Sequence, residues 1–274
     1  MSSRLLGNRL AASGLIVVSL IATTGLLAPW LVPYDPIEQR LESRLERPSV
    51  AHPFGTDELG RDVLSRVLMG TRVSMRVGLT VVLISSVAGV LIGGISGFVG
   101  GRTDLFVTVV LINALQAFPG ILLAIALVAF LGPGLDRLIL ALSVMGWVGY
   151  ARLARGQVLK VRMLDFVEAA RGLGASRTRL FLTHILPNIV QPILVQASIG
   201  MAGAILAEAF LSFLGLGIAP PTPSWGSMLN EARNHLFDAP HLVVFPSLLL
   251  MATVMSLNLA GDALRDWLDP KTQI

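Results

Sequence analysis

The chain has 274 residues, of which 54% are hydrophobic and only 14% are charged, and its mean hydropathy is +0.74. A soluble globular domain carries about 25% charged residues, so this composition excludes a water-exposed surface around the whole chain. The formal net charge of +4 does not indicate nucleic-acid binding, because the basic residues stand beside apolar stretches. With no cysteine in the sequence, disulfide bonds, cysteine-ligated zinc and iron–sulfur clusters are excluded.

Long charge-free stretches recur along the sequence and predict membrane-spanning helices, since a bilayer core needs about 20 apolar helical residues. In chain order the predicted spans are Leu10–Tyr34, Val77–Gly101, Leu105–Leu135, Leu138–Ala151, Leu180–Ala207 and Ala239–Gly261. The fourth has only 14 charge-free residues, but Arg152 and Arg155 after it can reach the interface along their aliphatic stems. The sequence therefore predicts an all-α, polytopic membrane protein with six transmembrane helices.

The distribution of basic residues predicts how these spans are oriented. The first apolar run is too long for a signal peptide and has no clean cleavage site, so we expect an uncleaved first helix. Loops on one side carry ten of the 21 Lys and Arg residues, and the longest of these loops has only Asp165 and Glu168 as acids. The ten are Arg4, Arg9, Arg102, Arg152, Arg155, Lys160, Arg162, Arg171, Arg177 and Arg179. The positive-inside rule then places both termini in the cytoplasm. Asp35–Arg76 would lie outside, with seven arginines and seven acidic residues.

Small residues repeat at four-residue steps in two of the spans. In the second span the repeated residues are Gly89, Gly93, Gly97 and Gly101. We interpret them as sites of close helix packing, and the alternative is a hinge for gating. In the fifth span, Gly200, Ala204, Glu208 and Ser212 share one helical face, so Glu208 should point into the bundle. Glu208 is either a fixed interhelical contact or part of the translocation path or gate, and Asn113 and Gln116 are its expected partners.

The segment after the fourth span predicts a helix–turn–helix hairpin on the cytoplasmic face. Helix-forming residues run from Asp165 to Arg171, and Gly172 and Gly174 can take left-handed conformations that end a helix. Ser176 can cap the next helix, and Pro187 marks where the chain enters the membrane. Such a basic, rigid hairpin can sit in a cleft of a soluble partner.

Several motifs then carry a resemblance to a known family. Glu168-Ala169-Ala170, Gly174 and Leu186-Pro187 resemble the EAA motif of ABC importer permeases, with His184 where the family has isoleucine. Three further stretches resemble the second permease subunit of the dipeptide/oligopeptide/nickel group: His52–Arg66, Glu208–Gly217 with Pro223–Gly226, and Gly261–Pro270.

This resemblance implies the MetI-like fold of type I ABC importer permeases. Residues 1–76 would form an N-terminal segment with the first helix and an extracytoplasmic loop. Residues 77–267 would form a core of five helices, with a coupling helix at about 164–187. The implied ATPase-coupling residues are Glu168, Ala169, Ala170, Gly174, Leu186 and Pro187. The implied partners are a homologous second permease, two ABC ATPase subunits and an extracytoplasmic solute-binding protein.

No enzymatic activity or cofactor is expected in this chain. Gly55–Gly60 has the glycine spacing of a Walker A loop, but Arg61 and Asp62 replace the lysine and hydroxyl residue that hold phosphate and Mg²⁺. ATP and Mg²⁺ would therefore bind to the partner ATPases. Among the solutes of the family, the sequence favours dipeptides or oligopeptides, and nickel or another small solute is the alternative.

Two other function classes fit less well. An intramembrane enzyme would need a nucleophile or metal set at membrane depth, and no G-x-S-x-G or H-E-x-x-H motif is present. A stand-alone channel or secondary transporter would commonly show internal repeats, and none is evident. His235, Asp238 and His241 are interpreted as loop residues, with contact to a binding protein or a metal as the alternative. The four tryptophans, Trp30, Trp147, Trp225 and Trp267, are partly explained as interface anchors, and Trp225 lies in the 218–238 loop, expected against the outer face.

Overall fold

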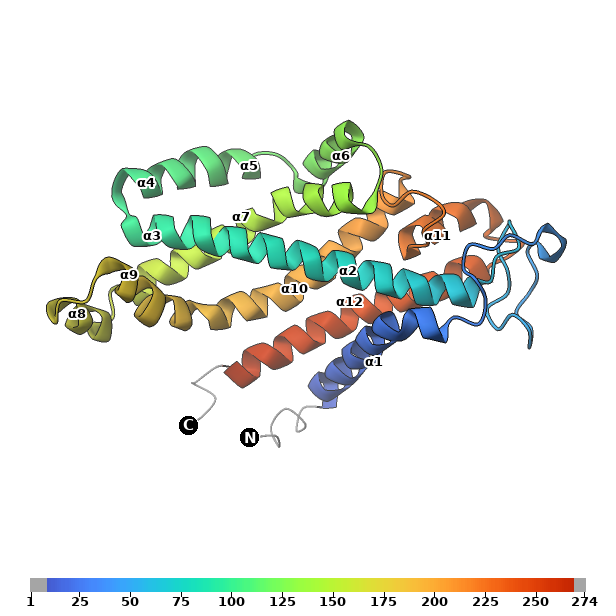
Figure 1. Cartoon of the computed structure of the whole chain (residues 1–274), viewed down its shortest axis with the longest axis horizontal. Helices are drawn as coiled ribbons and strands as arrows, with labels where there is room; N and C mark the ends of the chain where they lie inside the picture. The colour runs from blue at the N-terminus through green and yellow to red at the C-terminus, as the bar shows by residue number, and fades with distance from the viewer. Residues whose placement is uncertain (1–8, 269–274) are drawn as a thin grey trace.

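A computed structural model describes residues 9–268, in which the regular elements are helices laid side by side in one elongated bundle (Figure 1). The α-helices are α1 Arg9–Leu31, α2 Val63–Gly89, α3 Ile95–Val99, α4 Gly101–Phe106, α5 Ala114–Gln116, α6 Gly120–Leu131, α7 Leu135–Val161, α8 Asp165–Gly172, α9 Arg177–Arg179, α10 Leu186–Phe213, α11 Trp225–Ala232 and α12 His241–Leu268. Three π-helical segments, Val90–Gly94, Val107–Asn113 and Leu180–Ile185, join some of these helices, and Leu41–Ser43 and Arg233–His235 are short 3₁₀ turns. The all-α class predicted from the sequence is confirmed.

Five helical runs are long and apolar enough to cross a bilayer, namely Leu10–Leu31, Val63–Val99, Leu135–Val161, Arg177–Phe213 and His241–Leu268. The predicted first, second, fourth, fifth and sixth spans each lie largely within one of them. The second begins well before Val77, because the Asp62 carboxylate caps α2 by accepting a 2.7 Å hydrogen bond from the Ser65 amide. The division of the chain expected at residues 76 and 77 therefore falls inside a continuous helix, and it stays a prediction.

The third predicted span, Leu105–Leu135, differs from the uninterrupted helix expected there. Gly101–Gln116 and Gly120–Leu131 meet at an angle of 82°. The bend coincides with Pro119, which has no amide hydrogen to donate and disfavours helical geometry in the residue before it. The count of six spans holds if this bent pair crosses the bilayer as one unit.

The glycine steps of the second span bring the α2–α3 run against α7. A Cβ at Gly89 would lie 2.5 Å from the Cβ of Tyr150, and one at Gly93 would collide with the Ala151 carbonyl. At Gly97 the added Cβ would lie 3.1 Å from the Arg155 carbonyl oxygen. Close packing is therefore confirmed for these three. Gly101 differs, because it has a φ of +59° and begins α4 with nothing within 4 Å of an added Cβ.

Helix α1 lies along α2 and α12 on one side of the bundle (Figure 1). A Cβ at Gly14 would lie 2.6 Å from the Cβ of Leu259, so the start of α1 packs near the end of α12. We call the end of the bundle that carries α8 and α9 the hairpin end. The opposite end, with residues 32–62 and 214–240, is the cap end (Figure 1). Arg4 and the last part of the 261–270 motif lie outside the described residues.

Candidate functional site

The hairpin predicted between the fourth and fifth spans is present at the hairpin end. Helix α8 ends as the Gly174 amide donates to the Arg171 carbonyl at 3.0 Å, and Gly174 has a φ of +84°. The Ser176 hydroxyl then accepts a 3.3 Å hydrogen bond from the Arg179 amide and caps α9. The helix–turn–helix prediction is confirmed. Pro187 lies in the first turn of α10, which follows the π-helical segment Leu180–Ile185 within the span Arg177–Phe213.

A few apolar residues hold this hairpin to the bundle. Val167 is fully buried and packs in one cluster with Val161 of α7, Leu180 and Ile185. The outer surface is open: Met163, Phe166 and Leu173 are 68%, 44% and 90% exposed. Exposed residues around them are Leu164, Glu168, Ala169, Arg171, Gly174, Arg177 and Arg179.

Large apolar side chains that stay exposed together at one end of a molecule mark a surface that contacts another protein or a membrane. Among the expected coupling residues, Glu168, Ala169, Gly174 and Pro187 are exposed, and Ala170 and Leu186 are half-buried. Most of the motif is therefore available to a partner at the hairpin end.

Glu208 is fully buried, as its place on a small-residue face predicts. The Ser74 hydroxyl of α2 donates to its Oε2 at 3.2 Å, and the Ser212 hydroxyl donates to its Oε1 at 2.8 Å. The Ser212 oxygen also accepts a 3.3 Å hydrogen bond from the Ile218 amide. Glu208 thus connects α2 and α10 with the loop that follows α10.

The prediction that Asn113 and Gln116 are the partners of Glu208 is wrong. Both side chains are exposed on the bent pair, and Gln116 instead accepts a hydrogen bond from Arg152 of α7. Both residues lie on the arm that precedes the 82° bend, where Gln116 contacts α7 rather than α10. A role of Glu208, Asn113 or Gln116 in translocation stays a prediction.

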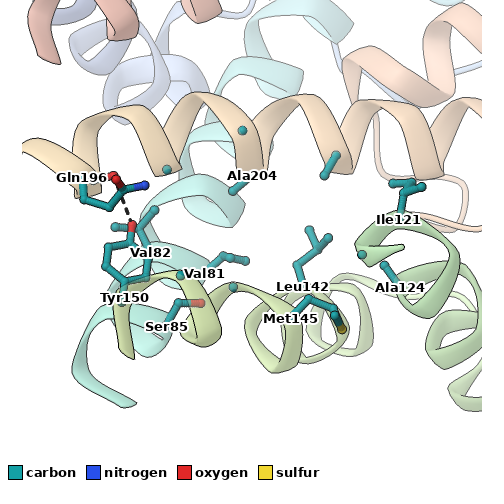
Figure 2. A pocket seen from close by; sticks show the side chains of 16 residues that line it. Val81, Val82, Ser85, Ile121, Ala124, Leu142, Met145, Tyr150, Gln196 and Ala204 are labelled. Carbon is teal, nitrogen blue, oxygen red and sulfur yellow. Dashed lines mark hydrogen bonds between the residues drawn. The ribbon is translucent and has the colours of Figure 1, made fainter. Parts of the chain in front are cut away.

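A cavity of about 290 Å³ lies among α2, α6, α7 and α10 (Figure 2). Its lining residues are Val81, Val82, Ser85, Gly120, Ile121, Ala124, Leu142, Met145, Gly146, Gly149, Tyr150, Gln196, Gly200, Gly203, Ala204 and Ala207. None of them is charged. The Tyr150 hydroxyl donates a 3.4 Å hydrogen bond to the Gln196 carbonyl across one end of the cavity (Figure 2).

Sequence reasoning missed this cavity, although two signals pointed to it. Gly146 and Gly149 occur three residues apart in the fourth span, and Gly200 and Gly203 do so in the fifth. Such pairs indicate a thin helical face in each span. That the two faces oppose one another depends on how α7 and α10 pack, which no local pattern reports.

Buried charges hold the cap end together. Arg61 Nε donates to Asp57 Oδ2 at 2.6 Å, and Arg61 and Arg66 both donate to Glu231 Oε2 of α11, at 2.7 and 3.0 Å. Arg61, Arg66 and Asp57 are all buried. Arg61 and Asp62 are thus occupied in a structural network and in capping α2.

The remaining polar candidates do not form a metal site. His235 Nε2 lies 3.3 Å from Glu58 Oε2, while His241 Nε2 lies 3.4 Å from the Thr56 carbonyl oxygen. Asp238 Oδ2 is 3.5 Å from His235 Nδ1. Within residues 9–268 no group of three or more histidines, cysteines or acidic residues could hold a metal ion.

The interface-anchor interpretation fails for one tryptophan. Trp225 is fully buried at the start of α11, and its indole Nε1–H donates to the Val67 carbonyl at 3.2 Å. Gly70 lies beneath the ring, where a Cβ would be 2.9 Å from its Cδ1. Trp30 and Trp267 are 79% and 43% exposed, as anchors require. Trp147 packs beside a buried cluster formed by α7 and the π-helical segment Val107–Asn113.

Two family models match the sequence. Residues 89–274 match the binding-protein-dependent transport system inner membrane component. Residues 1–48 match the N-terminal transmembrane domain of oligopeptide transport permease C. The first match includes the hairpin, Glu208 and the cavity residues from Gly120 to Ala207, whereas Val81, Val82 and Ser85 precede it. The second match includes α1.

Curated relatives are similar along almost the whole chain. A glutathione transport system permease protein of Pectobacterium atrosepticum is 45% identical over 95% of this chain and 86% of its own length. A di/tripeptide transport system permease protein of Pseudomonas aeruginosa is 43% identical over 96% of this chain and 89% of its own. A probable D,D-dipeptide transport system permease protein of Escherichia coli is 42% identical over 97% and 89%.

Proposed function

The chain belongs to the family of binding-protein-dependent transport system inner membrane components, and we propose that it serves as one permease subunit of an ABC importer for peptides. The relatives named above support this substrate class, since all three are permeases named for glutathione, di/tripeptide or D,D-dipeptide transport. Glutathione is itself a tripeptide, so the three names share one chemistry. Peptides are therefore favoured over nickel.

The hairpin is the observation that carries the mechanism. Its outer surface combines exposed apolar side chains, Phe166 and Leu173, with exposed arginines, while Val167 anchors it to α7 and to the start of the fifth span. A rigid projection of this kind transmits a push along two membrane-spanning helices. We assign it as the coupling helix that docks on an ABC ATPase, with Glu168, Ala169, Ala170, Gly174, Leu186 and Pro187 as the coupling residues.

This assignment sets the orientation and the partners. The hairpin end faces the cytoplasm, with both termini on that side, and the cap end faces outward in the inner membrane of a prokaryote. A homologous second permease completes the passage, two ABC ATPases bind ATP and Mg²⁺, and an extracytoplasmic binding protein delivers the solute at the cap end. This chain holds no nucleotide of its own.

Uptake by the full complex tests this function. A deletion strain carrying the complete transporter should accumulate labelled dipeptide and show no accumulation of labelled Ni²⁺. Replacing Glu168 by alanine should lower peptide uptake while the complex still assembles and hydrolyses ATP. Accumulation of Ni²⁺ without peptide would overturn the substrate class, and unchanged uptake in the Glu168→Ala variant would overturn the coupling assignment.

A further inference from the structure

Three exposed glycines that line the cavity are not explained by packing. A Cβ added to Gly120, Gly149 or Gly203 would meet nothing within 4 Å. By contrast, a Cβ at Gly146 would collide with the Ser85 hydroxyl and one at Gly200 with the Tyr150 hydroxyl. Gly149 and Gly203 lie well inside α7 and α10, where glycine costs about 1 kcal/mol of helix stability relative to alanine. Their presence opposes helix stability and leaves space in the cavity.

The polar groups of the cavity are neutral and suited to amides. The side-chain amide of Gln196 makes no hydrogen bond to another described residue, and the Tyr150 hydroxyl makes only the long bond to the Gln196 carbonyl. Lipid tails cannot satisfy such groups at membrane depth. Peptide main-chain amides can, because they both donate and accept, and every peptide carries them whatever its side chains.

The size of the cavity fits one small solute. Ligand pockets begin at about 300 Å³, and this cavity of about 290 Å³ is comparable. It lies among four helices, α2, α6, α7 and α10, three of which belong to runs that can cross the bilayer (Figure 2). A solute that crosses beside this chain can therefore use the cavity at membrane depth.

We propose that this cavity is a peptide subsite of the passage, and that Gly149 and Gly203 limit the size of the side chains that pass. The proposal rests on the function proposed above. Because the lining carries no charge, we expect acidic, basic and neutral peptides to be accepted. Because Cβ atoms are missing on two facing helices, we expect uptake to depend on the size of the peptide side chains.

Filling the cavity with a larger side chain tests the proposed limit on peptide size. Leucine at Gly149 or at Gly203 meets no neighbour at its Cβ and projects into the space. Gly156→Leu is the matched control, because Gly156 lies on the same helix α7, also has nothing within 4 Å of an added Cβ, and does not line the cavity. Each variant is introduced into the complete transporter.

The expected result depends on peptide size. In the Gly149→Leu and Gly203→Leu transporters, uptake of a dipeptide of two tryptophans should fall by about tenfold or more, and uptake of dialanine by less than about twofold. The Gly156→Leu transporter should match the unaltered one for both. Equal losses for both peptides, or no loss for either, would overturn the size limit.

Assembly must be measured in the same variants. If the cavity instead receives a helix of the second permease, the Gly149→Leu and Gly203→Leu variants will lose that subunit on purification, while the Gly156→Leu variant keeps it. That outcome assigns the cavity to subunit contact and refutes the proposal. Retention of all subunits with size-dependent uptake supports it.

A thiol probe separates this inference from the substrate class. The chain has no cysteine, so Gly149→Cys introduces a single thiol into this subunit. A water-soluble maleimide should label it in membrane vesicles containing the whole transporter, and dipeptide with binding protein should slow the labelling. An unreactive thiol refutes an aqueous passage here. If the thiol is labelled at the same rate with and without peptide, and the transporter takes up no peptide, the substrate class is refuted. The aqueous passage at Gly149 is then still supported by the labelling.

Discussion

The two ends of the bundle use charged residues in opposite ways. At the cap end, Arg61 and Arg66 are buried and share Glu231 and Asp57 as partners. At the hairpin end, Arg171, Arg177 and Arg179 are exposed and form no ion pair within the described residues. The cap end closes on itself, whereas the hairpin end presents unpaired charge beside exposed apolar side chains.

This difference separates stability from interaction. A buried ion network ties segments distant in sequence and is costly to break, because a partner left behind is an uncompensated charge. An exposed basic and apolar surface contributes little to the stability of its own chain and is available to a partner. Substitutions at the cap end should therefore act on folding, and those at the hairpin end on coupling.

The largest effect is expected at Arg66. Arg66→Ala removes a fully buried guanidinium that pairs with Glu231 at 3.0 Å, and should destabilise the cap end by about 3–5 kcal/mol. Arg40→Ala is the control, because the Arg40–Glu38 pair has side chains 52% and 48% exposed, and its loss should cost at most about 1 kcal/mol. Thermal melting of the purified complexes compares the two. Equal melting temperatures would show that the buried ion network does not stabilise the cap end more than an exposed ion pair does.

Glu208 should give the next largest effect. Glu208→Ala leaves the buried Ser74 and Ser212 hydroxyls without an acceptor, at a cost of about 1–3 kcal/mol for each unsatisfied group. Glu208→Gln keeps one acceptor oxygen and should lose less than half as much, with uptake retained. Melting temperature and uptake are measured together. If glutamine preserves stability but abolishes uptake, the carboxylate acts in transport rather than in holding α2 to α10.

A smaller and local effect is expected at the turn of the hairpin. Gly174 has a φ of +84°, and valine there adds about 1–2 kcal/mol of backbone strain. Gly174→Val should lower uptake per ATP hydrolysed without lowering the amount of assembled complex. Gly172→Ala is the control, since an added Cβ at that helical position also meets nothing within 4 Å. The coupling assignment is refuted by an unchanged ratio of uptake to hydrolysis.

The smallest effect on stability is expected at Leu173. This side chain is 90% exposed, so Leu173→Ser should change the stability of the chain by no more than about 0.5 kcal/mol. It should nevertheless weaken retention of the ATPase subunits during purification in detergent. Phe237→Ser is the matched control at the cap end, where Phe237 is 97% exposed and should not affect that retention. Equal retention in both variants would argue against docking at α8.

Local patterns in the sequence determined several features of this protein. Apolar runs of sufficient length define the spans, because a bilayer accepts only helices whose side chains are apolar over its thickness. Gly174 and Ser176 define the turn of the hairpin, since a left-handed residue and a capping hydroxyl act on their immediate neighbours. Gly89, Gly93 and Gly97 predicted close packing, because the absence of a Cβ is a property of the residue itself.

Only the tertiary structure decided which distant residues meet. Arg61 and Glu231 are 170 positions apart, and their pairing depends on how α11 folds back against α2. Glu208 accepts hydrogen bonds from Ser74 and Ser212, whereas Gln116 accepts one from Arg152 of α7. The cavity likewise exists because the thin faces of α7 and α10 oppose one another. Such contacts depend on how the helices pack, and a sequence pattern does not report the spatial distance between residues far apart in the chain.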